Sequence, residues 1–278
     1  MKGWLSGKTS LGRGRREYYS DLAIETCLTI RKVFRLALRQ CEGFISSLFR
    51  RLGINLEVPD YTVLCRRAAK LAIVLSPLLD KEAGPIDIVV DSTGLKVYGE
   101  GEWKVRKHGP GRHRTWMKLH LVIDSSNQQI KGCKLTTNAV DDASAVDGLL
   151  SSLTCDIKSF TGDGAYDKVK VRKRLPKGVK QIIPPQHNAV KSKGDKAYLN
   201  SRDEDLEIIA KRGRKQWKID VGYHKRSLAE TAMLRYKTIV GAGLQSRNER
   251  NQEVEAMLSC SILNKMLQLA KPISIKIN

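Results

Sequence analysis

A run of β-branched residues constrains the fold of this 278-residue chain more than any other feature. The run Pro85-Ile86-Asp87-Ile88-Val89-Val90 is typical of a buried strand, and it ends at Asp91. Further β-branched or alternating segments follow, with turn residues at 124–127. We expect them to form partner strands over residues 95–98, 115–123 and 129–136.

Downstream, the pattern changes to alternating helix and strand. We expect a helix over 141–153, short strands ending at 161–163 and over 181–183, a polar irregular insertion at 187–220, and closing helices over 224–240 and 247–269. Strands joined by hairpins, then alternating helix and strand, then helices, is the element order of a ribonuclease H-like α/β fold. The sequence therefore predicts a mixed sheet with flanking helices over residues 84–270.

The segment before this domain is predicted to be all-α. Helical periodicity runs over about 22–34, 38–52 and 61–73, and the third segment carries Arg66 and Arg67. Three short helices with a basic third member indicate a helix-turn-helix-like DNA-binding domain over residues 20–80. A plain helical bundle with solvated arginines is the alternative. Residues 1–19 are rich in Gly and Arg and are expected to be a basic mobile arm.

Charge and cysteine content narrow the partners and the compartment. Lys and Arg number 50 against 29 Asp and Glu, a net charge of +21. Such an excess favours a polyanionic partner, most often nucleic acid, although ribosome-binding and membrane-binding proteins share it. The six cysteines are scattered without a metal-binding spacing. With no secretory or membrane-spanning segment in the sequence, we expect a soluble protein of a reducing compartment, without a membrane partner.

Three acidic residues in different contexts suggest metal chemistry. Asp91 and Asp163 end strand-like runs and precede glycine-containing turns, while Glu230 lies in a helical stretch. Carboxylates at neighbouring strand ends can converge, and Glu230 would complete the cage from the side. Two Mg²⁺ ions held by a few carboxylates suit phosphodiester cleavage, and Mn²⁺ fits oxygen ligands too. Taken singly, the aspartates could be turn or cap residues, and Arg226 with Glu230 an ordinary surface ion pair.

Several basic and aromatic residues are candidate DNA contacts near these acids. On a uniform helix, Tyr223, Arg226, Glu230 and Lys237 share one face within about 60°. The basic loop 104–114 could position phosphates, and a strand-end tryptophan could stack on a base; a solvated loop and a packed ring are the alternatives. The candidates here are Lys104, Arg106, Lys107, Arg114 and Trp116.

The spacing Tyr223-x2-Arg226-x3-Glu230-x6-Lys237 resembles the Tyr-Arg-Glu-Lys signature of DDE transposases from bacterial insertion sequences. The stretches DSTGLKVYGEGEWKVRKHG, RTWMKLHLVID and TGDGAYD resemble the insertion-sequence-five group in particular. The resemblance covers about residues 14–272.

This resemblance implies a ribonuclease H-like catalytic domain in which Asp91, Asp163 and Glu230 hold Mg²⁺. Water and then a DNA 3′-hydroxyl would attack phosphodiesters, without a covalent enzyme–DNA intermediate. Tyr223, Arg226 and Lys237 would position DNA. The amino-terminal helices would bind the terminal inverted repeats of double-stranded DNA, and a homodimer or larger homo-oligomer would join both ends and target DNA in the bacterial cytoplasm, at the nucleoid.

The sequence departs from this group in two places. Members usually carry a few dozen more residues before the Gly-Arg stretch, and Met117 stands where a basic residue is usual. A shortened, catalytically silent protein that binds the repeats as a repressor or inhibitor is therefore a second hypothesis. A housekeeping ribonuclease H-like nuclease, without preference for a DNA end, is a third.

Overall fold

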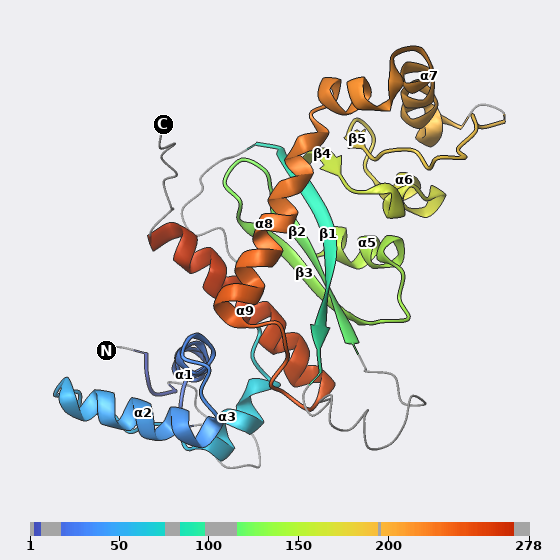
Figure 1. Cartoon of the computed structure of the whole chain (residues 1–278). Helices are drawn as coiled ribbons and strands as arrows, with labels where there is room; N and C mark the ends of the chain where they lie inside the picture. The colour runs from blue at the N-terminus through green and yellow to red at the C-terminus, as the bar shows by residue number, and fades with distance from the viewer. Residues whose placement is uncertain (1–2, 7–17, 76–83, 98–115, 194–195, 270–278) are drawn as a thin grey trace.

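A computed structural model describes residues 3–6, 18–75, 84–97, 116–193 and 196–269 (Figure 1). The amino-terminal part contains the three predicted helices. Ser20 Oγ accepts a hydrogen bond from Ala23 N at 3.1 Å and starts the first helix, and Asp60 caps the third in the same way. Their bounds are α1 (Asp21–Val33), α2 (Leu38–Arg51) and α3 (Tyr61–Ala68), so the third ends about five residues before the predicted position.

Residues 3–6 differ from the mobile arm expected there, because they pack on the helical domain. The Trp4 side chain is 7% exposed, and its indole N–H donates to the Glu57 carbonyl at 2.8 Å. Leu5 forms an isolated antiparallel bridge with Tyr19. The remainder of the expected arm before Tyr18 lies outside the described residues.

The centre of the protein is a mixed five-stranded sheet. Its strands are β1 (Ile86–Lys96), β2 (Trp116–Asp124), β3 (Ile130–Thr137), β4 (Ile157–Thr161) and β5 (Lys180–Ile182). They lie in the order β3-β2-β1-β4-β5. The first three are antiparallel neighbours, whereas β4 and β5 run parallel to β1. This order confirms the expected ribonuclease H-like sheet with flanking helices.

The first strand corrects one prediction. We expected a strand ending at Asp91 and a separate partner at 95–98, but β1 runs without a break through both segments. Asp91 lies opposite Leu121 and Leu95 opposite Met117, because β2 pairs with β1 along its whole length. Asp91 is therefore in the middle of a strand rather than at its end.

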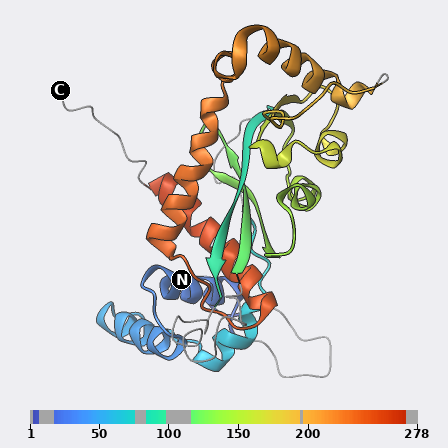
Figure 2. The same ribbon diagram turned by 45° about the vertical axis from the view of Figure 1, so that its right-hand side comes forward.

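Helices cover both faces of the sheet (Figures 1 and 2). On one face lie α8 (Ser227–Arg235) and α9 (Glu249–Leu269), and on the other α5 (Asp142–Ser151) and α6 (Val169–Arg174). Alternation along β1 separates the two cores. Val89 and Leu95 pack with α8 and α9, while Ile88 and Val90 pack with α5. Asp91 consequently faces the side that α8 covers, and Ser92 the side that α5 covers.

Helix α9 joins the two parts of the protein. Val254, Leu258 and Ile262 belong to the core of the helical domain, whereas Ala256 and Cys260 belong to the core on the sheet. A buried ion pair lies at the junction, with Lys32 Nζ 2.5 Å from Glu255 Oε1.

The segment predicted as an irregular insertion contains a long helix, α7 (Asn200–Asp220). It is kinked at Gly213, whose φ is +82°. Around the kink, the indole N–H of the buried Trp217 donates to Asp205 Oδ1 at 2.7 Å. The prediction of irregular backbone over 187–220 is wrong for these residues.

The backbone is helical over 224–240 as expected, but it is not one uniform α-helix. A 3₁₀ turn (Tyr223–Arg226) precedes α8, and a π-helical turn (Tyr236–Val240) follows it. Tyr223 and Lys237 therefore do not follow the 100° rotation per residue assumed for a single α-helix. Within the described ranges, no helix is both long and apolar enough to cross a membrane.

Candidate active site

Three carboxylates from separate elements form the candidate site. Asp91 lies in β1, Asp163 in the turn after β4, and Glu230 in the first turn of α8. Helix α8 packs across β1. Strand β4 is the parallel neighbour of β1, on the side of β1 away from β2. The three acids expected from the sequence are thus carried by adjacent elements.

Arg226 connects two of these acids. Its Nη1 donates to Asp91 Oδ2 at 2.9 Å, and its Nη2 donates to Glu230 Oε1. The i,i+4 pair with Glu230 was foreseeable from the sequence. The bond to Asp91 joins residues 135 positions apart and turns a helix surface pair into a link between helix and sheet.

The charges of Asp163 and Glu230 both act on the Asp91 carboxyl. Burial raises the pKa of the Asp91 carboxyl, while the Ser92 N–H and Arg226 oppose that rise. The negative charges of Asp163 and Glu230 raise this pKa further, so both lie close enough to Asp91 to repel it. A site with this much negative charge would be stabilised by an added cation.

Asp163 also has a structural role that the sequence left open. Its Oδ1 accepts a hydrogen bond from Ala165 N at 2.9 Å and caps the short 3₁₀ turn η1 (Gly164–Tyr166). Capping fixes the carboxylate at the end of β4.

Tyr223 lies beside the acids, as its position before Arg226 suggested. Burial raises the pKa of its phenol; Arg226 opposes this, and Asp163, Asp91 and Glu230 add to it. The Tyr223 ring centroid is 6.1 Å from that of Trp217. Lys237, by contrast, is exposed on the π-helical turn.

The other predicted DNA contacts have four different outcomes. Arg66 is exposed on α3, but Arg67 is 8% exposed and donates to the Tyr19 carbonyl at 2.9 Å and to Asp21 at 2.6 Å. The guanidinium of Arg67 is thus committed to internal packing, which corrects its assignment to a DNA surface. Trp116 is half-buried over Gly94. The loop residues Lys104, Arg106, Lys107 and Arg114 lie outside the described residues.

A second polar cluster, on the α5 side of the sheet, was missed by the sequence analysis. Asp142 Oδ1 accepts hydrogen bonds from Ser92 Oγ at 3.0 Å and from Lys118 Nζ at 3.3 Å. His120 Nδ1 lies 3.7 Å from the same oxygen, and burial lowers the pKa of His120 to about 4. The paired aspartates that start α5 were the available signal. Only one of them, Asp141, is needed as the helix cap.

The donor set of the acidic trio fits a hard divalent ion, because it consists of carboxylate oxygens. In the parts of the chain that the structure describes, however, no three His, Cys, Asp or Glu side chains are grouped closely enough to hold a metal. The Arg226 guanidinium is paired with both Asp91 and Glu230 instead. A cation bound between these two acids would compete with Arg226 for their oxygens.

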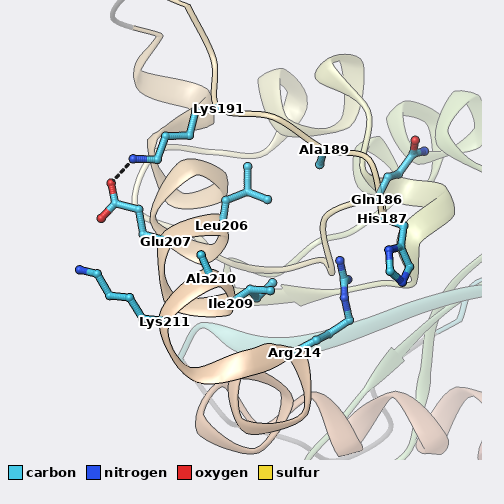
Figure 3. Close-up of a pocket in the computed structure, with 10 residues that line it drawn as sticks. All are labelled: Gln186, His187, Ala189, Lys191, Leu206, Glu207, Ile209, Ala210, Lys211 and Arg214. Atoms are coloured by element: carbon cyan, nitrogen blue, oxygen red, sulfur yellow. Dashed lines mark hydrogen bonds and ion pairs between the residues drawn. The ribbon is translucent and has the colours of Figure 1, made fainter.

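A separate cavity lies beside α7 (Figure 3). It encloses about 550 Å³ and is lined by α7 and by the segment that follows β5. Lys191 pairs with Glu207 at its rim, and Lys211 and Arg214 add positive charge. None of the three acids lines it, so it is distinct from the candidate active site.

Comparison with known protein families shows to which family the chain belongs. Two family models described as transposase DDE domain match it, one over residues 1–100 and the other over residues 82–265. The chain belongs to the DDE transposase domain family.

The backbone of the chain is similar to that of two solved structures. One is a piggyBac transposase synaptic complex with hairpin DNA, at a TM-score of 0.47 and 12% identity, covering 94% of this chain and 68% of that one. The other is a Drosophila P element transposase strand transfer complex, at a TM-score of 0.36 and 12% identity, covering 95% of this chain and 63% of that one.

Proposed function

We propose that this protein is a transposase of the insertion-sequence-five group. It binds the terminal inverted repeats of its element and catalyses metal-dependent DNA strand cleavage and strand transfer. Membership of the DDE transposase domain family supports the class of reaction. The Tyr223, Arg226, Glu230 and Lys237 spacing supports the group.

One observation carries the proposal: Arg226 joins Asp91 to Glu230 while the charge of Asp163 acts on the same carboxyl. An aspartate used only as a turn or cap residue has no reason to share one guanidinium with a helical glutamate. A site that handles divalent cations and phosphates does require such a concentration of charge.

Asp91, Asp163 and Glu230 would hold Mg²⁺, as two ions, with Mn²⁺ as a substitute. When bound, these ions supply an activated water and offset negative charge on the leaving oxygen. Water oxygen attacks phosphorus, the bond from phosphorus to the 3′-oxygen breaks, and a 3′-hydroxyl is left. In strand transfer that hydroxyl attacks a target phosphodiester in the same way, losing its proton.

Arg226, Tyr223 and Lys237 would hold DNA next to these acids. A guanidinium released from Asp91 and Glu230 is suited to a phosphate, which accepts two parallel N–H bonds. The Tyr223 phenol remains protonated because its pKa is raised, so it can donate to phosphate oxygen. The net charge of +21 favours duplex DNA as the partner, and a homodimer or larger assembly would join the two element ends.

The test is cleavage of a labelled duplex that carries the terminal repeat flanking the coding region. We expect Asp91→Asn, Asp163→Asn and Glu230→Gln each to abolish Mg²⁺-dependent nicking while gel-shift binding is retained. Asp147→Asn is the matched control, because Asp147 is a surface carboxylate that pairs with Arg174 among the residues the structure describes.

Undiminished nicking by one acid variant would remove that residue from the site. Binding without nicking by the unsubstituted protein, in Mg²⁺ and in Mn²⁺, would instead favour the repressor. Nicking without preference for the element end would favour a general nuclease.

A further inference from the structure

The last turns of α7, residues 214–220, form a short basic segment next to the candidate active site. They follow the kink at Gly213, and all but one of the acids of α7 lie before that kink. The one acid in the segment, Asp220, accepts a hydrogen bond from Gln216 Nε2 at 2.8 Å and lies 2.7 Å from Arg212 Nη1. The only acid of the segment is therefore already paired, with a cation from before the kink.

Two lysines of this segment are available to an anion. Arg214 donates to the Pro185 carbonyl at 2.7 Å, but Lys215 and Lys218 are exposed, and neither pairs with an acid among the described residues. They are three positions apart on a helix and so lie on the same side of it. Two ammonium groups on one side of a helix, without a carboxylate between them, present a surface that attracts an anion.

Lys218 lies against Tyr223, a residue of the candidate site. Its Nζ is 5.3 Å from the centroid of the Tyr223 ring, the arrangement of a cation–π contact. A second neighbour of that ring is Trp217, whose centroid is 6.1 Å away. Trp217 is fully buried and its indole N–H donates to Asp205, so the end of α7 is anchored beside Tyr223.

From Tyr223 a short path leads to the acids. Tyr223 and Arg226 are the first and last residues of one 3₁₀ turn, and Arg226 donates to Asp91 Oδ2 at 2.9 Å and to Glu230. Figure 1 shows α7 leading through this turn into α8. The ammonium of Lys218, the phenol of Tyr223 and the guanidinium of Arg226 are thus three donors in succession that end at the acidic trio.

We propose that Lys215 and Lys218 bind backbone phosphates of the DNA duplex whose scissile phosphate lies at the acidic trio. The inference rests on the proposed function, since it takes DNA as the substrate. Two observations favour DNA as the occupant: exposed positive charge without acids fits a polyanion, and the segment adjoins a residue that would hold the scissile strand. An ammonium binds phosphate as a point charge, so these contacts position DNA without reading its sequence.

The alternative is a purely local role for these lysines. Cations near the carboxyl end of a helix stabilise that helix through its dipole. Such a role would act on the melting temperature and leave DNA binding unchanged, whereas phosphate contacts act on DNA affinity and on its salt dependence.

The test is binding of the whole chain to a labelled duplex that carries the terminal repeat, over a series of salt concentrations. Fluorescence anisotropy measures it in EDTA, which prevents cleavage. The slope of log affinity against log salt concentration falls by about 0.9 for each phosphate contact removed, so we expect that loss in Lys215→Gln and in Lys218→Gln, and about 1.8 in the double variant. The weakening should be equal on a duplex of unrelated sequence, and Lys218→Arg should keep the unsubstituted slope.

Lys158→Gln is the matched control. Lys158 is an exposed lysine at the start of β4, whereas Asp163 follows the other end of that strand. We expect this variant to bind DNA with the affinity and slope of the unsubstituted protein. Melting temperatures without DNA verify that every variant is folded.

An unchanged slope in both lysine variants would overturn the inference, as would an equal loss in Lys158→Gln, which would show an effect of net charge alone. Nicking of the element end separates the two proposals. If the unsubstituted protein nicks it in Mg²⁺ while the slope is unchanged in the lysine variants, only the inference on α7 fails. If the unsubstituted protein neither binds nor nicks the duplex, the proposed function and the inference both fail.

Discussion

Replacing Gly162 by alanine should destabilise the protein through a single contact. The added Cβ would lie 2.8 Å from Tyr166 Cδ2, about 0.7 Å inside the normal carbon–carbon separation of about 3.5 Å. The ring cannot yield, because it is fully buried against Phe160 and α5. Overpacking of this kind costs about 1–3 kcal/mol, which for a protein of this size lowers the melting temperature by roughly 2–4 °C per kcal/mol.

The control is two residues away. At Gly164 the nearest atom to an added Cβ would be the Pro184 carbonyl oxygen at 3.7 Å, an ordinary contact. We therefore expect Gly164→Ala to change stability by less than about 0.5 kcal/mol. Thermal unfolding in EDTA measures both variants. If Gly162→Ala were as stable as Gly164→Ala, the Tyr166 ring would not be fixed against Gly162 as described.

Two further predictions concern buried ionisable side chains. Lys32→Met leaves the Glu255 carboxylate buried without its cation, so it should lower the free energy of unfolding in urea by about 3 kcal/mol. The control Lys265→Met breaks a partly exposed pair with Glu25 at 3.0 Å and should cost less than about 1 kcal/mol. Equal costs would contradict the difference in burial between the two pairs. Burial lowers the pKa of His120 to about 4 from 6.5, so its contribution to stability is fully present above pH 6.5 and is lost as the pH falls toward 4, about 3 kcal/mol in all. His120→Gln should flatten the pH dependence of stability over that range, and an unchanged slope would refute the assignment.

The sequence predicted best what depends on local signals. Ser20 and Asp60 mark the starts of α1 and α3, because a side-chain oxygen there satisfies backbone N–H groups. The alternation in β2 likewise indicated a strand with two different faces, and its Met117, Leu119 and Leu121 enter the core with α8 and α9.

Predictions failed where tertiary pairing overrides local preference. Ser92, Thr93 and Gly94 suggest a turn after Asp91, yet pairing with β2 keeps them extended. In α7 the helix is polar on most sides and buries few side chains, among them Asp205 and Trp217, so its periodicity was too weak to detect.

The candidate site shows the same division. The order of Asp91, Asp163 and Glu230 along the chain indicated their chemistry, and the i,i+4 spacing indicated the bond between Arg226 and Glu230. The bond from Arg226 to Asp91 depends on how α8 packs across β1, which residue spacing does not determine.

The central claim is that Asp91, Asp163 and Glu230 form one metal site. The most direct measurement is calorimetric titration of Mn²⁺ into the unsubstituted protein, the three acid variants (Asp91→Asn, Asp163→Asn and Glu230→Gln) and the Asp147→Asn control. We expect every acid variant to weaken binding by at least about tenfold, because each removes a charged ligand, and the control to bind as the unsubstituted protein does. Undiminished Mn²⁺ binding in all three acid variants would contradict the claim.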